Sequence, residues 1–508
     1  MATLARALKR SSLLASRGQD AQAVREIQRV VEQAAPGDAD SARAQVELAV
    51  LLARSNRLDE AAMHARRAVH GEPGDAYGHE VLSAVLRKQD RLTEAVHASR
   101  RAVTCEPNRA QAHDALAVCL QESGRLDEAL FHIQRATMLE PGKASRYVNG
   151  SIIKLRMGDP SGGLEDLRNA KARGLQSDGL LWNEALLRLA QGDLERGWDL
   201  YEHGFAAGER TPEREFSLPR WQGESLAGKT LLVWREQGIG DEVRFLSCLP
   251  EVIARAGRVI LETQERLVPL LQRSFPEAEV RVQAPERSAA DDNAGLGEPD
   301  VHAPAGDLPR YLRRRPGAFP DHTGYLDVDA TRRADFGARL EALGPGPRIG
   351  VAWRSRNLKT ARLANYFTLD ELAPILRLPG VTLVNLQYGP RQMLEDEIAA
   401  FESETGLRIH RWSDLDYTDD LDAVAALTSS LDVVVAPGSF PADLAGALGV
   451  PTYRLSGPVH PQSYARLWNP TVRIRSRRHD EGWARVVEEV RNEIGERFLS
   501  REGGRGHG

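Results

Sequence analysis

The sequence predicts an array of paired α-helices followed by two α/β domains with parallel sheets. A 34-residue period runs through the first two-fifths of the chain. After it come short runs of Val, Ile and Leu that alternate with helical segments, a pattern typical of parallel strands covered on both faces. At 508 residues the chain is also too long for a single hydrophobic core, which favours about three domains.

Leucine, alanine and proline recur at one spacing in the first part of the chain. Small residues let two helices cross closely, and proline ends the second helix so that the next pair begins. We expect three clear repeats, a degenerate one over 3–36 and two looser ones ending near Phe205. The pattern resembles the tetratricopeptide repeat (TPR), and it is carried by Leu58, Leu92, Leu126, Ala61, Ala95, Ala129, Pro73, Pro107 and Pro141.

Such an array binds protein partners in a concave groove that is lined by the first helix of each pair. Some arrays clamp extended peptides with a ladder of asparagines, but the matching groove position here holds Val81 and Ala115. The alternative is that the polar side chains of this face are only solvated. The repeat register places toward the groove Arg43, Arg54, Tyr77, Glu80, Lys88, Gln111, Asp114, Gln121 and Glu122, among which Arg54, Tyr77, Lys88, Gln111 and Asp114 are the candidate partner contacts.

The strands after the array fall into two groups, which predicts two Rossmann-like domains that face each other across a cleft. The first group contains "TLLVW", "RVILET" and "EVRVQ", and the second "RIGVAW", "VTLVNLQ" and "LDVVVAP". A small, acidic stretch at 286–300 predicts a surface loop. The expected boundaries are 1–206 for the repeats, 207–228 for a polar linker, 229–345 and 346–480 for the two halves, 481–500 for a helix that straps the halves together, and 501–508 for a disordered tail.

Composition narrows the function classes. The net charge of −5 gives no general attraction for nucleic acid. No apolar stretch approaches the roughly 20 residues that cross a bilayer, and the N-terminus lacks the apolar block of a signal peptide. Three widely spaced cysteines fit neither a disulfide framework nor a zinc site. We therefore expect a cytoplasmic protein with no metal, no nucleic-acid partner and no membrane span.

The stretch "REQGIGDEVRF" (235–245) follows the first strand of the α/β region. It lacks the third glycine of the dinucleotide fingerprint, since Val243 stands there, and it lacks the lysine of a phosphate loop. Asp241 and Glu242 fall in the first turn of the following helix, where carboxylates are favoured. Asp241 is therefore either a helix cap or a carboxylate that acts as a general base or recognises sugar hydroxyls.

The order of these features resembles a known family. The repeats, the bridge "GWDLYEHGF", the "GIGDE" turn, "GVAWRS", "NLQYG" and "LAGALGVP" together resemble bacterial TPR glycosyltransferases with a heptosyltransferase-like catalytic region of the GT-B fold. Some such relatives modify flagellin. The resemblance implies a nucleotide-sugar substrate, no cofactor, and Asp241 as the base. The candidate acceptor-side and loop residues are Gly238, Gly240, Glu242 and His460, and the alternative for His460 is a surface histidine with no role as a base.

The second half should hold the nucleotide. The turn "PGSFP" ends one strand and begins a helix, so backbone N–H groups near Gly438, Ser439 and Phe440 can bind phosphate. The stretch "WRSRNLKTAR" follows the first strand of the same half and brings cations to the same edge, which a metal-free transferase needs. The remaining candidate donor contacts are Arg354, Ser355, Lys359, Arg362 and Gln387.

The chain departs from the family at one point. Where heptosyltransferase-like enzymes carry Asp and His, this sequence has Gly438 and Asp443, which argues against a heptose donor. Three readings follow. The first is a protein glycosyltransferase, for which the resemblance implies Ser or Thr of a flagellin-like acceptor and a CMP-linked nonulosonic acid. The second is a non-catalytic TPR scaffold or chaperone with a degenerate GT-B region, and the third is a repeat protein regulated by a free nucleotide.

Overall fold

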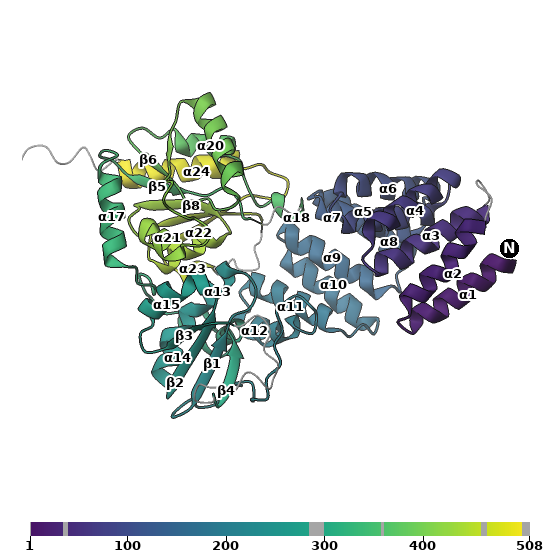
Figure 1. Cartoon of the computed structure of the whole chain (residues 1–508), viewed down its shortest axis with the longest axis horizontal. Coiled ribbons are helices and arrows are strands. Elements are labelled where there is room, and N and C mark those ends of the chain that lie inside the picture. The colour runs from purple at the N-terminus through teal and green to yellow at the C-terminus, as the bar shows by residue number, and fades with distance from the viewer. Residues whose placement is uncertain (1, 34–38, 284–298, 357–359, 459–464, 500–508) are drawn as a thin grey trace, which may run out of the picture. The chain divides into compact units, whose positions relative to one another are not determined.

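The computed structural model describes residues 2–33, 39–283, 299–356, 360–458 and 465–499 (Figure 1). The chain divides into two compact units, which are treated separately below. The repeat unit is built mainly from residues 1–154 and 165–175. The α/β unit is built mainly from residues 176–358 and 362–508.

Paired helices form the N-terminal part of the described chain, as the 34-residue period predicts. The small repeat residues Ala61, Ala95 and Ala129 are completely buried, because they lie where the helices of a pair cross. In the three clear repeats the second helix ends two residues before the repeat proline. The helices are α1 (Ala2–Ser16), α2 (Asp20–Gln33), α3 (Ala39–Arg54), α4 (Leu58–Gly71), α5 (Ala76–Lys88), α6 (Leu92–Cys105), α7 (Ala110–Glu122), α8 (Leu126–Leu139), α9 (Ala144–Met157), α10 (Pro160–Ala172), α11 (Asp178–Gln191) and α12 (Leu194–Tyr201).

The first half of the α/β unit contains a four-stranded parallel sheet of order β3-β2-β1-β4. One face of β1 packs against helices through Leu231 and Val233, and the other face packs against Phe205 and Phe216 of the segment that precedes the sheet. The elements are β1 (Thr230–Trp234), α13 (Ile239–Phe245), α14 (Leu249–Arg255), β2 (Arg258–Thr263), α15 (Val268–Ser274), β3 (Glu279–Val282), β4 (Val301–Pro304) and α16 (Leu308–Leu312).

The second half contains a six-stranded parallel sheet of order β10-β9-β8-β5-β6-β7. Alternate residues of β8 enter different cores, Val433 and Val435 on one face and Val434 on the other, so the sheet is covered on both faces. The elements are β5 (Arg348–Val351), α18 (Thr360–Leu363), α19 (Leu369–Leu376), β6 (Thr382–Asn385), α20 (Arg391–Thr405), β7 (Ile409–His410), α21 (Leu421–Thr428), β8 (Val433–Pro437), α22 (Phe440–Ala447), β9 (Thr452–Ser456), α23 (Ala465–Trp468), β10 (Val472–Ser476) and α24 (Ala484–Ile494).

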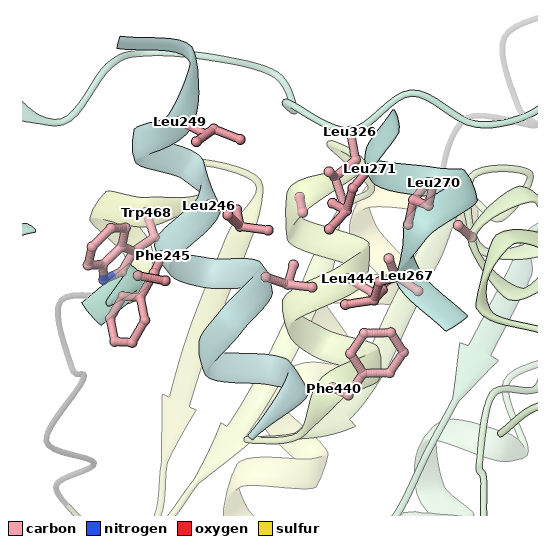
Figure 2. Close-up of a cluster of buried hydrophobic side chains, with 14 of the residues drawn as sticks. Phe245, Leu246, Leu249, Leu267, Leu270, Leu271, Leu326, Phe440, Leu444 and Trp468 are labelled. Atoms are coloured by element: carbon pink, nitrogen blue, oxygen red, sulfur yellow. The ribbon is translucent and has the colours of Figure 1, made fainter. Parts of the chain in front are cut away.

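The two halves share one hydrophobic core. Figure 2 shows Phe245 of the first half beside Trp468, and Leu267 beside Leu444 of α22. The rings of Phe245 and Trp468 meet edge to face with centroids 6.1 Å apart. Helices α13 and α22 run next to each other at the centre of this core. The segments that follow β1 and β8 are thereby fixed against each other.

The C-terminal helix differs from its expected role. We predicted that it straps the halves together, but the buried residues of α24, such as Val487 and Ile494, belong to the core of the second half alone. The helix packs on α19 and β10 because its apolar stripe matches the outer face of that sheet. The predicted tail at 501–508 and most of the predicted loop at 286–300 lie outside the described residues. No described helix is both long and apolar enough to cross a membrane.

Candidate functional site

Parallel sheets bind ligands beyond the carboxyl ends of their strands, where the strand order reverses. In the second sheet the reversal lies between β5 and β8. The segments after these two strands are 352–356 and 438–439, which the sequence predicts as the cationic segment and the phosphate turn. In the first sheet the reversal lies between β1 and β4, so the glycine turn at 235–240 adjoins the other crevice.

Side chains fill the crevice of the first sheet. Glu236, completely buried after β1, accepts hydrogen bonds from Arg210 Nε at 2.7 Å and from the Gly306 backbone N–H at 2.9 Å. Arg210 Nη2 also reaches Asp307 Oδ1 at 3.0 Å, and its guanidinium stacks on Phe205. Because the arginine comes from the segment that precedes the sheet, this segment closes the crevice.

The glycine turn presents one carboxylate outward and buries the next. Gln237 adopts a left-handed backbone conformation with φ of 57°, and Gly238 precedes α13. The side chain of Asp241 is 30% exposed, and its Oδ1 lies 3.4 Å from Arg244 Nη1. Glu242 is only 1% exposed and accepts hydrogen bonds from Thr263 and Gln264. This corrects the expectation that Glu242 contacts the acceptor, because its carboxylate faces the protein interior.

A buried charge cluster joins the two halves beside this turn. Arg244 Nη2 donates to Asp443 Oδ1 at 2.8 Å, and Arg454 Nη1 donates to the same oxygen at 3.2 Å. All three side chains are at most 7% exposed. A Cβ added at Gly240 would stand 2.7 Å from Asp443 Oδ2, so glycine permits α13 to approach α22 this closely. Asp443, one of the two residues that mark the departure from the heptosyltransferase-like pattern, is thus a contact between the halves.

Two predicted donor contacts have other partners. The side-chain oxygen of Gln387 accepts from the backbone N–H groups of Trp353 and Arg354, and its NH2 group donates to the carbonyls of Arg354 and Tyr388. The hydrogen-bonding capacity of this buried amide is fully used within the protein. The Arg354 guanidinium forms an ion pair of 2.7 Å with Glu397 of α20. Gln387 therefore holds the segments after β5 and β6 in place, and the charge of Arg354 is neutralised.

The other predicted donor residues occupy different positions. Ser439 and Phe440 are buried, so only their backbone faces the turn, while Gly438 is exposed above the guanidinium of Arg454. Ser355 is half-buried, and its hydroxyl lies 3.5 Å from that of Tyr388. Arg362 is exposed on α18. The predicted contacts Lys359 and His460 lie outside the described residues.

A pocket of about 470 Å³ opens in the second half between the segments that follow β6 and β7. Its walls carry two aromatic side chains, Trp412 and Tyr417, together with the cations Arg356, Arg391 and Arg411. Arg411 is already paired with Glu395 at 2.7 Å and with Glu402 at 3.1 Å. The motif "NLQYG" (385–389) reaches only the edge of this pocket, at Asn385 and Gly389. The Trp and Tyr that flank an acidic run were the available signal for the other wall.

The acidic run at 414–422 is held by arginines from outside its own segment. Asp422 forms a bidentate ion pair with Arg273 of the first half, at 2.6 and 3.1 Å. The other pairs are Asp414 with Arg339, Asp419 with Arg266, and Asp420 with Arg332. Arg339 and Arg332 belong to α17 (Ala330–Glu341), which packs on α21. The run is therefore ion-paired, and its residues 414–419 form a wall of the pocket, whereas its composition alone is typical of a solvated loop.

In the repeat unit, a groove of about 270 Å³ lies between α5, α7 and α9. The predicted partner contacts Gln111 and Asp114 line it, together with Asn149. Asn149 Nδ2 donates to Asp114 Oδ1 at 2.9 Å, and burial raises the pKa of Asp114. The other predicted contacts lie outside this hollow. Tyr77 is 39% exposed, Arg54 pairs with Asp20 and Lys88 Nζ donates to the Ala53 carbonyl.

Among the described residues, no group of three or more His, Cys, Asp or Glu side chains is arranged to hold a metal ion. No known protein-family profile matches the sequence. The chain is 35% identical over 349 residues to Protein FlbA of Caulobacter vibrioides (strain ATCC 19089 / CIP 103742 / CB 15). The match covers 64% of this chain and 57% of that protein, so the chain spans little more than half the length of its relative.

Three similar solved structures each cover at most 40% of this chain. MamA (residues 41 to the end) from Desulfovibrio magneticus RS-1 is 16% identical, with 34% of this chain and 95% of that chain covered and a TM-score of 0.30. YrrB, a TPR protein with an unusual peptide-binding site, is 23% identical, with 34% and 86% covered and a TM-score of 0.28. PilW, a type IV pilus biogenesis factor, is 14% identical, with 40% and 92% covered and a TM-score of 0.36. The chain combines TPR-type helical repeats with a parallel-sheet α/β region.

Proposed function

We propose that the chain is a metal-independent protein glycosyltransferase that moves a sugar from a nucleotide-sugar to Ser or Thr of a protein recruited by the repeats. One observation carries the proposal. The turn that bears Asp241 and the turn at Gly438 and Ser439 begin helices that are packed against each other. The carboxylate of Asp241 and the turn at Gly438 and Ser439 therefore lie near the contact of two helices, and the pocket of about 470 Å³ opens further along the second sheet, after β6 and β7.

The pocket suits the nucleoside part of the donor. Its volume lies within the range of about 300 to 1,000 Å³ that is typical of ligand sites. Trp412 and Tyr417 offer aromatic surface for a base or a ribose, and the exposed Arg356 can approach phosphate oxygens. Arg356 takes the part that we expected of Arg354, because the latter is ion-paired with Glu397. The phosphates then reach the turn before α22, where the backbones of Gly438 and Phe440 are the candidate contacts, because the Ser439 N–H donates to the Pro437 carbonyl and Pro441 has no N–H.

In the transfer step, Asp241 removes the proton of the Ser or Thr hydroxyl as its oxygen attacks the anomeric carbon. The bond from that carbon to the phosphate oxygen breaks, and the nucleotide leaves with the electron pair. The exposed Arg356 and the backbone of the turn at Gly438 stabilise the charge that develops on the phosphate, because Arg454 beneath that turn is buried and paired with Asp443. A flagellin-like acceptor and a CMP-linked nonulosonic acid donor are what the family resemblance favours.

The alternative is a non-catalytic TPR scaffold or chaperone. Two observations favour it: the Arg354–Glu397 ion pair and the saturated amide of Gln387 remove two of the predicted donor contacts. Against it, Asp241 remains partly exposed and the pocket remains open. Catalysis is therefore the better supported reading.

Turnover of activated sugars tests this choice. The full chain is incubated with CMP-, UDP-, GDP- and ADP-linked sugars, and release of the free nucleotide is followed by chromatography. We expect release from one nucleotide class, and a loss of at least about 100-fold in the Asp241→Asn variant, because that variant cannot accept the proton. Nucleotide binding should persist in Asp241→Asn. Equal release by the two proteins contradicts the base role, and binding without any release favours the scaffold.

A further inference from the structure

We propose that Arg266 is a positioning residue through which the first half holds one wall of the nucleotide pocket in register with the turn that bears Asp241. The inference rests on the proposed nucleotide site in the second half. Arg266 lies in the short 3₁₀ turn Glu265–Leu267 after β2, so it belongs to the half that does not contain the pocket. Its contacts run in both directions, toward the pocket wall and toward the glycine turn.

Toward the pocket, Arg266 reaches the segment that follows β7. Its Nη1 donates to the backbone carbonyl of Thr418 at 2.8 Å and lies 3.6 Å from Asp419 Oδ1. Both Thr418 and Asp419 line the pocket. The short contact is to a main-chain carbonyl, so Arg266 fixes the backbone of the segment that lines the pocket. It thereby affects a ligand that this segment contacts.

Toward the glycine turn, Arg266 is one end of a hydrogen-bond relay. Its Nη2 and Nε donate to Gln264 Oε1 at 2.9 and 3.2 Å, and Gln264 Nε2 donates to Glu242 Oε2 at 3.0 Å. Thr263 donates to the other oxygen of Glu242. Glu242 follows Asp241 directly in α13, so the relay ends one residue from the candidate base.

Glu242 explains why the relay is rigid. It is 1% exposed and takes no part in the proposed chemistry, and a carboxylate buried to this degree must be held by hydrogen-bond donors. Each amide or guanidinium group in the relay has a defined partner on both sides. A shift of the pocket wall is therefore transmitted to the helix of Asp241, and a fixed helix in turn fixes the wall. Binding of the nucleotide thus depends on a side chain that does not line the pocket.

The chain offers a matched control on the same acidic run. Arg332 forms a bidentate pair with Asp420 at 2.7 and 2.8 Å, and its side chain is 44% exposed. Asp420 precedes α21 and does not line the pocket. Both arginines make partly exposed ion pairs, so neither Arg266→Ala nor Arg332→Ala should change the melting temperature of the nucleotide-free chain by more than a few degrees.

The test is a titration of the full chain with CMP, UDP, GDP and ADP by calorimetry. For the nucleotide that binds the wild-type chain, Arg266→Ala should raise the dissociation constant roughly 3- to 30-fold, whereas Arg332→Ala should leave it unchanged. Arg266→Lys should recover part of the affinity, because lysine can donate to the Thr418 carbonyl but cannot also bridge to Gln264 with two N–H groups.

A second measurement separates a relay from a local effect on the wall. Gln264→Ala removes the middle of the relay but leaves the contact between Arg266 and Thr418. It should therefore weaken binding of the same nucleotide, and its effect on the dissociation constant should not add to that of Arg266→Ala. Equal affinity of the wild-type and Arg266→Ala chains overturns the relay but leaves the nucleotide site intact. Failure of all four nucleotides to bind the wild-type chain removes the site, and the inference with it.

Discussion

Arg244 of the first half donates a hydrogen bond of 2.8 Å to Asp443 of the second half, across 199 residues of sequence. Arg454 donates to the same carboxylate oxygen, so one buried acid is shared by two buried arginines. Desolvating three charges is costly unless they are paired, which makes the cluster sensitive to loss of its single acid. The cluster therefore holds the two halves together at the point where their helices meet.

Asp443→Asn should be strongly destabilising. The variant keeps the size of the side chain but removes the buried carboxylate that Arg244 and Arg454 share, which should lower the free energy of unfolding by about 3 to 5 kcal/mol. Urea denaturation measures the difference. The control is Asp419→Asn, whose side chain is 74% exposed and whose loss should cost less than about 1 kcal/mol. Similar stabilities for the two variants would show that the cluster does not hold the halves.

Gly240→Ala should also destabilise the chain. The added methyl group would stand 2.7 Å from Asp443 Oδ2 and 3.6 Å from the backbone of Phe440, and Asp443 cannot move aside because two arginines hold it. Overpacking of this kind costs about 1 to 3 kcal/mol. Gly337→Ala in α17 is the matched control, since nothing lies within 4 Å of its added methyl group, and it should stabilise the helix slightly. Thermal melting of both variants decides the point, and an unchanged Gly240→Ala would contradict the close helix contact.

Acid should destabilise the chain partly through His302. Burial, and then the charge of Arg220, lowers the pKa of His302 from 6.5 to about 4, and its Nδ1 accepts a hydrogen bond of 3.1 Å from Trp234. Between pH 6.5 and 4 the unfolded chain therefore binds more protons than the folded chain, so the free energy of unfolding falls as the pH falls through this window. The loss from this group approaches about 3 kcal/mol.

His302→Gln tests this assignment, because glutamine keeps an acceptor for Trp234 but does not titrate. Urea denaturation at several pH values should show a shallower loss of stability below pH 6.5 in the variant than in the wild-type chain. Above pH 7 the free energy of unfolding should depend on pH equally in the two proteins, because the histidine is neutral in both the folded and the unfolded state. Parallel curves across the whole range would mean that His302 does not contribute to the acid sensitivity.

The architecture was accessible from sequence because its signals are local. The 34-residue recurrence of Ala61, Ala95 and Ala129 marks helix crossings, and the Val-rich β8 marks a strand buried on both faces. The turns at Gly238 and Gly438 also followed from strand-to-helix boundaries in the sequence. The finer expectations, namely the GT-B assignment and the catalytic roles, stay predictions.

The partners of the site residues could not be read from sequence, because they depend on contacts between distant segments. Nothing near Arg354 in the sequence shows that Glu397 neutralises it, and nothing near Asp443 points to Arg244. The composition of the run at 414–422 is also typical of a solvated loop, although Arg339 and Arg266 pair with its residues Asp414 and Asp419, which line the pocket. Side-chain pairing across the halves decides these roles.

The most direct test of the account is thermal stabilisation of the full chain by CMP, UDP, GDP and ADP at millimolar concentration, beside a Trp412→Ala variant. A ligand present at 100 times its dissociation constant stabilises the folded state by about 2.7 kcal/mol, which raises the melting temperature by several degrees. We predict that one of the nucleotides produces this rise, and that Trp412→Ala, which melts at a lower temperature by itself because Trp412 packs on Phe336, loses the response. If none of the four nucleotides raises the melting temperature of the wild-type chain, the α/β unit is not a nucleotide-binding site and the glycosyltransferase proposal fails.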